Sequence, residues 1–104
     1  MATHVSAFTI VFPDWYDDRA EFEHASKGFL PDVSVRLEDG AEYSLYFIDP
    51  VRLAQDLECE TQSGRPFLAE SGLVVIPTVR SEAIRTAVAG LWHQGFFRRL
   101  KPTG

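Results

Sequence analysis

Residues 33–57 read VSVRLEDGAEYSLYFIDPVRLAQDL, and this stretch decides the fold. Apolar residues alternate on both sides of Asp39-Gly40, a pattern that predicts two strands joined by a tight turn. Glycine adopts the left-handed backbone that closes a three-residue loop, so Glu38 to Gly40 are expected to form the turn. A two-residue loop would mix polar and apolar side chains on each face. The three-residue loop groups the apolar ones, setting Val33, Val35 and Leu37 beside Tyr43, Leu45 and Phe47.

A helix is expected directly after this hairpin. Asp49 has a side chain that accepts a backbone N–H at a helix start, and Pro50 suits the first helical position. The apolar residues that follow at helical spacing make one stripe: Leu53, Ala54 and Leu57. We therefore expect this helix to lie on the face of the hairpin. The polar segment from Cys59 to Pro66 then predicts a connecting loop.

The segment before the hairpin predicts one strand and one helix. Val5 to Phe12 is rich in β-branched and aromatic residues and ends at Pro13, which favours an opening strand in the main sheet. Asp17 or Asp18 is suited to cap a short helix that stops at Lys27-Gly28, because glycine commonly ends helices.

A second unit of the same plan is predicted after residue 66. Two candidate strands, Phe67–Ala69 and Leu73–Ile76, flank Glu70-Ser71-Gly72, a loop of the same make as Glu38-Asp39-Gly40. Ser81 is positioned to cap the helix that follows. The apolar residues of that helix recur with helical spacing: Ile84, Ala87, Val88, Leu91 and Trp92. Side-chain identity between the units is slight, so they indicate a reused plan rather than a duplication.

These elements predict a single α+β domain over residues 1–104, with about five mostly antiparallel strands in two strand-turn-strand-helix units. Two to three helices are expected to pack on one face of the sheet. Val74 to Ile76 is apolar at successive positions, which favours a central strand. Gly95 is expected to stop the last helix, with Phe96-Phe97 folding back on it and Pro102 to Gly104 fraying.

Composition indicates a globular chain with an uneven charge. The hydrophobic content is 45%, and no apolar run approaches the roughly 18 residues of a membrane helix, so no membrane association is expected. The single cysteine, Cys59, and the absence of a secretory pattern at the N-terminus favour a cytoplasmic location. The net charge is −5, with 13 acidic and 4 basic residues among the first 60. That balance disfavours nucleic acid as a partner and favours a basic protein.

Motifs that carry catalysis or cofactor binding are missing from the sequence. His4, His24 and His93 have no metal-binding spacing, so neither a metal site nor a cofactor is expected. Cys59 sits between Glu58 and Glu60, whose negative charges disfavour the reactive thiolate. The glycines and serines form neither a phosphate-binding loop nor a nucleophile elbow. An enzyme is therefore the less favoured reading, and the question of activity stays open.

One stretch combines aromatic anchors with acids, the composition of a recognition site. Asp14, Trp15, Tyr16, Asp17 and Asp18 follow the opening strand, and the nearby helix adds Glu21 and Glu23. Large rings bury much area at small entropic cost, and acids steer a basic partner. The alternative is that both rings pack on the core while the acids cap a helix.

Three classes of function follow. The favoured one is a small acidic protein-binding module without catalysis, of the inhibitor, immunity or accessory-subunit kind, which recognises a basic partner through Asp14 to Asp18 and Glu21. The first alternative is a small-ligand-binding protein or enzyme whose site is assembled from scattered His and Asp residues. The second is a self-associating structural domain, a homodimer that pairs through a sheet edge or through Trp92, Phe96 and Phe97.

Overall fold

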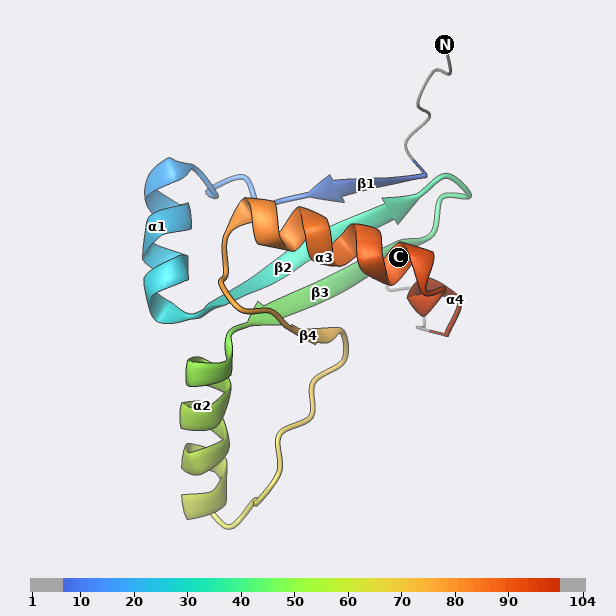
Figure 1. Ribbon diagram of the computed structural model, residues 1–104. Coiled ribbons are helices and arrows are strands. Elements are labelled where there is room, and N and C mark those ends of the chain that lie inside the picture. Colours follow the sequence, from blue (N-terminus) through green and yellow to red (C-terminus); the bar gives the residue numbers. More distant parts are fainter. Residues whose placement is uncertain (1–6, 100–104) are drawn as a thin grey trace.

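The computed structural model describes residues 7–99 as a small α+β domain built on one sheet (Figure 1). Helices and strands alternate irregularly along the chain. In order, the elements are β1 (Phe8–Val11), α1 (Asp18–Lys27), β2 (Phe29–Leu37), β3 (Glu42–Ile48), α2 (Pro50–Gln62), β4 (Leu73–Val75), α3 (Ser81–His93) and α4 (Phe96–Arg99).

The sheet has four strands in the order β1-β2-β3-β4 and is mixed. β1, β2 and β3 pair antiparallel, whereas β4 runs parallel to β3. The prediction of about five mostly antiparallel strands is therefore only roughly met. Phe67–Ala69 forms no strand, so the second strand-turn-strand unit does not exist. β4 is an edge strand of three residues, and the prediction of a central strand at Val74 to Ile76 is wrong.

The β2–β3 hairpin forms as predicted. Val35 pairs with Tyr43 and Val33 with Leu45, the register that a loop from Glu38 to Gly40 imposes. Gly40 has φ +90°, the left-handed conformation that glycine adopts at little cost. A bulge between Leu30 and Val33, with Asp32 at φ 63°, brings both of these apolar side chains into the core.

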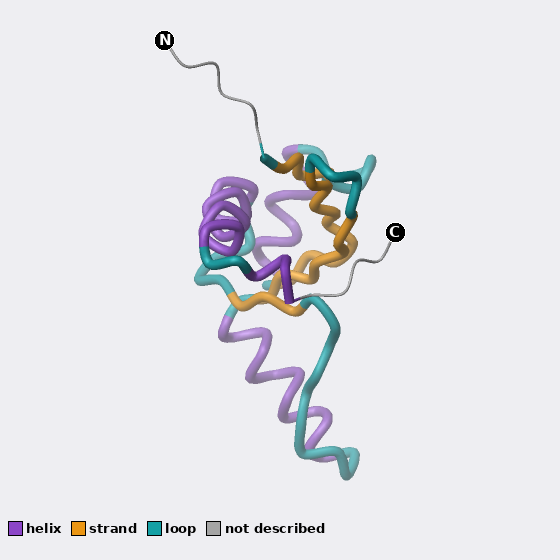
Figure 2. Tube along the Cα trace, turned by 90° about the vertical axis from the view of Figure 1, so that its right-hand side faces the viewer, coloured by secondary structure: helices purple, strands orange, loops and turns teal. Residues whose placement is uncertain are grey.

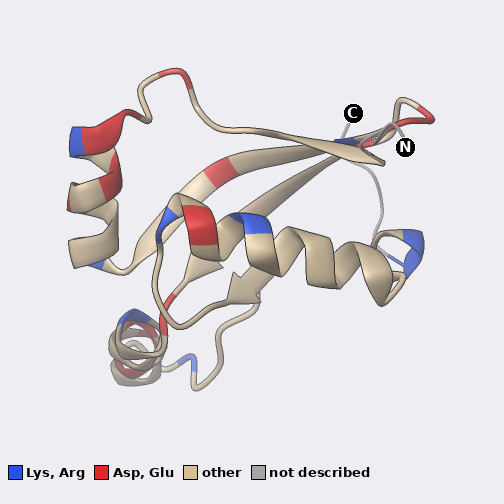
Figure 3. Ribbon diagram, turned by 45° about the horizontal axis from the view of Figure 1, so that its top comes forward, with Lys and Arg blue, Asp and Glu red and all other residues tan. Residues whose placement is uncertain are grey.

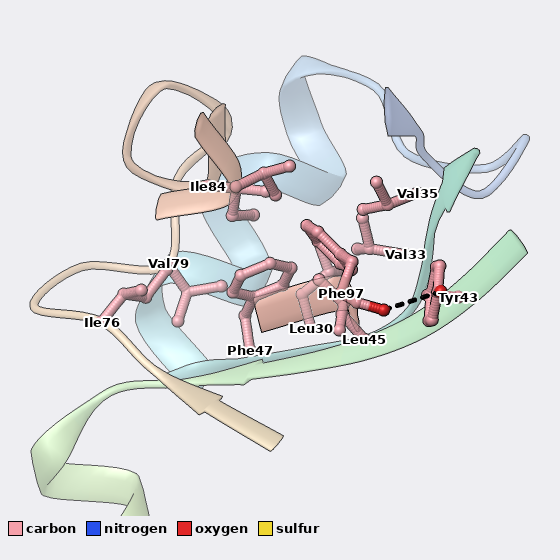
Figure 4. Close-up of a cluster of buried hydrophobic side chains, with 11 residues drawn as sticks. Leu30, Val33, Val35, Tyr43, Leu45, Phe47, Ile76, Val79, Ile84 and Phe97 are labelled. Carbon is pink, nitrogen blue, oxygen red and sulfur yellow. Dashed lines mark hydrogen bonds between the residues drawn. The ribbon is translucent and has the colours of Figure 1, made fainter. Parts of the chain in front are cut away.

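One face of the sheet carries the core, and α3 lies across it (Figures 1 and 4). Ile84 and Val88 of α3 are fully buried, as its apolar spacing predicts. The chain turns at Gly95 into α4, which buries Phe97 against Tyr43 with ring centroids 5.1 Å apart. The Tyr43 hydroxyl donates a 2.8 Å hydrogen bond to the Phe97 carbonyl oxygen, so the last helix is fixed to the sheet.

α1 stands at one end of the sheet, between the end of β1 and the start of β2 (Figure 1). The Asp17 carboxylate accepts a 2.8 Å hydrogen bond from the backbone N–H of Ala20, and Gly28 ends the helix at φ +82°. Both ends of this helix are as predicted. β1 begins at Phe8, and the first residues of the predicted strand, Val5 and Ser6, lie outside the described residues.

α2 differs most from its predicted position. Its start is as expected, because Asp49 accepts a 2.8 Å hydrogen bond from the N–H of Arg52 and Pro50 opens the helix. The helix does not lie on the hairpin, however, but points away from the sheet in two perpendicular views (Figures 1 and 2). None of its residues is buried, and Leu57 of the predicted stripe is 40% exposed. The packing prediction for Leu53, Ala54 and Leu57 is wrong.

Two boundaries also need correction. α2 continues to Gln62, so Cys59 lies on an exposed helix instead of in a loop. Arg80 occupies the N-cap position of α3 and makes no side-chain cap, so Ser81 does not cap this helix. The predicted fraying of Pro102 to Gly104 lies outside the described residues. No helix within residues 7–99 is long and apolar enough to cross a membrane.

Candidate functional site

The acidic and aromatic stretch predicted from the sequence forms the turn that leads from β1 into α1. The N–H of Tyr16 donates a 2.9 Å hydrogen bond to the carbonyl of Pro13, and the N–H of Asp17 donates one of 3.1 Å to the carbonyl of Trp15. These hydrogen bonds hold the backbone of the turn that carries the side chains of Trp15 and Tyr16. We call the surface of Asp14, Trp15, Asp17, Asp18 and Glu21, with Phe12 and Tyr16 behind it, the acidic-aromatic surface.

Trp15 is held in place by its neighbours yet remains on the surface. Its ring lies 6.3 Å from that of Tyr16, edge to face, and 5.0 Å from the imidazole of His24. The residue is nevertheless 50% exposed. An aromatic side chain that is oriented but not covered has already lost much of the freedom that binding would otherwise remove.

Tyr16 is the inward-facing member of the pair. Its ring stacks on Phe12 at 5.0 Å with an interplanar angle of 11°, and it packs against the core. The Tyr16 hydroxyl oxygen is buried, and no residue of the described chain hydrogen-bonds to it. Burial, followed by the negative charge of Glu21, raises the pKa of Tyr16 to about 12.

The acids divide into caps and free charges. Asp17 caps α1, and Glu21 accepts 2.7 Å hydrogen bonds from both the N–H and the hydroxyl of Ser81 at the start of α3. These bonds lower the pKa of Glu21 below its ordinary value. Asp14 and Asp18 are exposed and make no hydrogen bond or ion pair within residues 7–99. Tyr16, Asp17 and Glu21 thus have structural roles within the domain, whereas Trp15, Asp14 and Asp18 remain exposed on its surface.

A small hollow of about 200 Å³ opens beside these acids. Phe12 and Tyr16 line it together with three carboxylates, those of Asp17, Asp18 and Glu21. Arg85 of α3 completes the wall, its guanidinium lying 5.2 Å from the centroid of the Phe12 ring. The hollow thus combines a ring face with acids on one side, a setting in which a positively charged side chain is electrostatically favoured. In Figure 3, acidic residues gather on α1, whereas the start of α3 carries basic and acidic residues together.

A row of rings continues from this surface across the start of β2. His24 lies 5.5 Å from Phe29, which stacks on Tyr46 at 6.1 Å. His24 Nδ1 is 2.8 Å from the carbonyl oxygen of Phe29, and the Arg52 guanidinium lies 4.4 Å above the Phe29 ring. Sequence reasoning missed this row because its members, His24, Phe29 and Tyr46, lie on three different elements. Phe29 and Tyr46 both lie near the open end of the hairpin, but they are 17 positions apart in the sequence.

The residues predicted for self-association lie at the other end of the sheet. Phe97 is buried at 3% exposure, and Trp92 and Phe96 are partly buried against the core. A cavity of about 410 Å³ beside them is lined by residues that include His93 and Asp39. The structure does not test the role of Trp92, Phe96 and Phe97 in pairing.

Histidines and cysteine are dispersed in the structure. His24 belongs to the row of rings, His93 ends α3, and Cys59 is free and exposed on α2. His4 lies outside the described residues. In the described part of the chain, no group of three or more His, Cys, Asp or Glu residues is arranged to hold a metal ion.

Comparison with known proteins adds no further information, since no family model, curated protein or solved structure matches this chain.

Proposed function

We propose that this protein is a small acidic protein-binding module without catalysis, and that it recognises a basic partner through the acidic-aromatic surface. The observation that carries the proposal is Trp15, a large ring held by two neighbouring rings and still 50% exposed. Tryptophan is among the residues that contribute most to protein interfaces, because one side chain buries a large area with only two rotatable bonds.

The charges around Trp15 support a basic partner. Asp14 and Asp18 flank the ring in sequence, are exposed and have no partner within residues 7–99. Their charges remain available to steer an approaching basic protein, which raises the association rate more than the final affinity. The hollow beside them, lined by Asp17 and Glu21, adds a place for one cationic side chain of the partner.

A pull-down from source-cell lysate with mass spectrometry tests this function. We expect the wild type to capture one basic protein, and Trp15→Ala to weaken that complex about 30-fold or more, the loss typical of an aromatic hot spot. Val75→Ala is a matched control, because Val75 is 48% exposed but lies on β4, at the opposite edge of the sheet from β1. It should leave binding unchanged.

The contribution of the Asp14 and Asp18 charges to binding is measured separately, as an association rate. Asp14→Asn with Asp18→Asn is expected to lower the association rate with the captured protein at least threefold at low salt. The difference should shrink at 0.5 M salt, where charges are screened beyond a few ångströms. A partner that binds Trp15→Ala as tightly as wild type would refute the proposed site, and an acidic partner would refute the proposed chemistry.

A further inference from the structure

The cavity of about 410 Å³ lies between the end of the β2–β3 hairpin and the corner where α3 leads into α4. Tyr43 lines it from β3, Trp92 from α3 and Phe97 from α4. It shares no described residue with the acidic-aromatic surface or with the hollow beside that surface. The cavity is therefore a second place at which this chain can take a ligand.

The walls of the cavity are held by hydrogen bonds of the chain itself. The bond of 2.8 Å from the Tyr43 hydroxyl to the Phe97 carbonyl oxygen joins α4 to β3 (Figure 4). On the hairpin side, the Asp39 carboxylate accepts a 2.9 Å hydrogen bond from the N–H of Ala41. A site whose walls are already formed loses little conformational freedom when a small molecule enters, and this favours binding.

Two opposite charges line the cavity without pairing with each other. Asp39 belongs to the hairpin wall and Arg98 to the α4 wall, and both are exposed. Within residues 7–99, neither of them makes an ion pair. His93, in the last turn of α3, adds an imidazole that can donate or accept a hydrogen bond. A molecule with one positive and one negative group matches this lining, whereas an ion of a single sign meets one like charge.

The rest of the described lining is mainly apolar and aromatic. Leu37 and Trp92 are partly buried, and the hydroxyl of Tyr43 is already bonded to Phe97, so these residues offer apolar surface. An apolar group that enters the cavity is removed from water, which is favourable in proportion to the area buried. The volume is near the lower end of the roughly 300–1,000 Å³ range of ligand pockets and suits a molecule of amino-acid size.

We propose that this cavity binds a free α-amino acid with an aromatic or large aliphatic side chain. Its ammonium group lies toward Asp39, its carboxylate toward Arg98, and its side chain against Leu37 and Trp92. Such a molecule is neutral overall at pH 7 and carries one group for each part of the lining: a cation, an anion and an apolar body. This ligand is distinct from the protein partner proposed for the acidic-aromatic surface.

Titration of the ¹⁵N-labelled full chain with L-phenylalanine, followed by NMR, tests the site. We expect amide shifts concentrated in residues 37–43 and 92–98. Phenethylamine, which lacks the carboxylate, and 3-phenylpropanoate, which lacks the amine, should each bind at least fivefold more weakly, because one charge of the protein is left unpaired. Equal binding of the three compounds would overturn the assignment. Shifts confined to other residues, or none at millimolar L-phenylalanine, would overturn the site itself.

Adjacent arginines provide a matched pair on the α4 wall. Arg98→Ala should weaken L-phenylalanine binding at least fivefold, and it should weaken phenethylamine binding less, because that compound has no carboxylate to lose a partner. Arg99→Ala removes the same charge from the next exposed position, which is not among the residues that line the cavity, and should bind like the wild type. Equal losses for both variants would show that only the net charge matters, which contradicts the proposal.

Adjacent acids provide the corresponding pair on the hairpin wall. Asp39→Asn keeps an oxygen that can accept from the N–H of Ala41, so the turn is preserved while the charge is lost. It should weaken L-phenylalanine binding at least fivefold and 3-phenylpropanoate binding less. Glu38→Gln, at the preceding exposed position outside the lining, should bind like the wild type. An Asp39→Asn variant that is folded by circular dichroism and binds all three compounds as the wild type does would overturn the role of Asp39.

Discussion

α2 and α3 are helices of equal length, 13 residues each, and both are amphipathic, yet only α3 belongs to the core. α3 buries Ile84 and Val88 completely, whereas α2 buries no residue. The two helices are entered differently. α2 follows β3 after a single residue, Asp49, and leads away from the sheet, whereas α3 follows β4 after a five-residue turn and lies across the sheet (Figure 1). An apolar stripe therefore determines which face of a helix is available for packing, and the connection before it determines whether that face meets the core.

The largest expected difference in the free energy of unfolding is the one between a truncated side chain on α3 and a truncated side chain on α2. Ile84→Ala should lower the free energy of unfolding by about 3 kcal/mol, because a fully buried side chain is replaced by a cavity. Leu57→Ala should change it by less than about 1 kcal/mol in a monomeric sample, because this side chain is already 40% exposed. Urea denaturation measures both. Equal losses would mean that α2 packs in the core after all.

Gly40, which precedes β3, and Gly72, which precedes β4, provide the next test. Gly40 and Gly72 both have positive φ, but a Cβ at Gly40 meets open space, whereas one at Gly72 collides with the carbonyl oxygen of Ser44. Gly40→Ala should cost about 1 kcal/mol of stability for the left-handed backbone alone. Gly72→Ala should cost at least about 2 kcal/mol, since β4 must also move away from β3. Urea denaturation of the two glycine variants measures the difference in the free energy of unfolding. Similar losses for both would contradict the close packing of β4 on β3.

The N-termini of the two helices are capped by different means. Asp49 caps α2 from the adjacent position, whereas Glu21 of α1 caps α3 across 60 residues of sequence. Glu21→Ala should cost about 1 kcal/mol at neutral pH, the usual value of a lost cap. Glu23→Ala is the matched control on α1, because within residues 7–99 Glu23 pairs only with the exposed Arg19 and should contribute little to stability.

The Glu21 cap also predicts a pH dependence. Because the pKa of Glu21 is lowered by folding, its stabilisation is complete above the ordinary value of 4.5 and is lost as the pH falls through the folded value. Thermal melts from pH 6 down to pH 3 should therefore show a shallower decline for Glu21→Ala than for the wild type. Parallel declines would show that Glu21 does not hold the start of α3.

The smallest effect on the free energy of unfolding is expected for a substitution of Tyr16, which lies beside the start of α3. Its buried hydroxyl lacks a partner within residues 7–99, so Tyr16→Phe should be neutral or slightly stabilising at neutral pH. Folding raises the pKa of Tyr16 from 10.0 to about 12, so the wild type should lose stability as the pH rises through that interval. Tyr16→Phe should lose less over the same range. A destabilising Tyr16→Phe would reveal a hydrogen bond to this hydroxyl.

The parts of the fold that sequence predicts well are those encoded by neighbouring residues. The β2–β3 register, the Asp49-Pro50 start of α2 and the Gly28 end of α1 each depend on a few positions that are close in sequence. β4 was misjudged because apolar runs such as Leu73 to Val75 do not reveal strand direction or sheet position. The similarity of Gly72 to Gly40 was also misleading, since a glycine with positive φ serves a hairpin turn in one place and a close strand approach in the other.

The candidate site was predictable in composition but not in geometry. Trp15 and the acids around it stand together in the sequence, which was enough to select the stretch. Which ring turns inward depends on the stacking of Tyr16 on Phe12 and on contacts with α3. The bond between Glu21 and Ser81 and the ring row from His24 to Tyr46 join distant elements, and no local pattern predicts such pairs.

The parallel pairing of β3 with β4 also has a consequence for the order of folding. The hairpin between β2 and β3 closes a loop of three residues, whereas β4 reaches β3 only after the chain has made the whole excursion between Ile48 and Leu73. Closing the longer loop costs about 2 kcal/mol more chain entropy. We therefore expect the hairpin to be formed in the folding transition state, and β4 with α3 to dock afterwards. Contacts of Val35 with Tyr43 would then govern the rate of folding, and those of α3 the rate of unfolding.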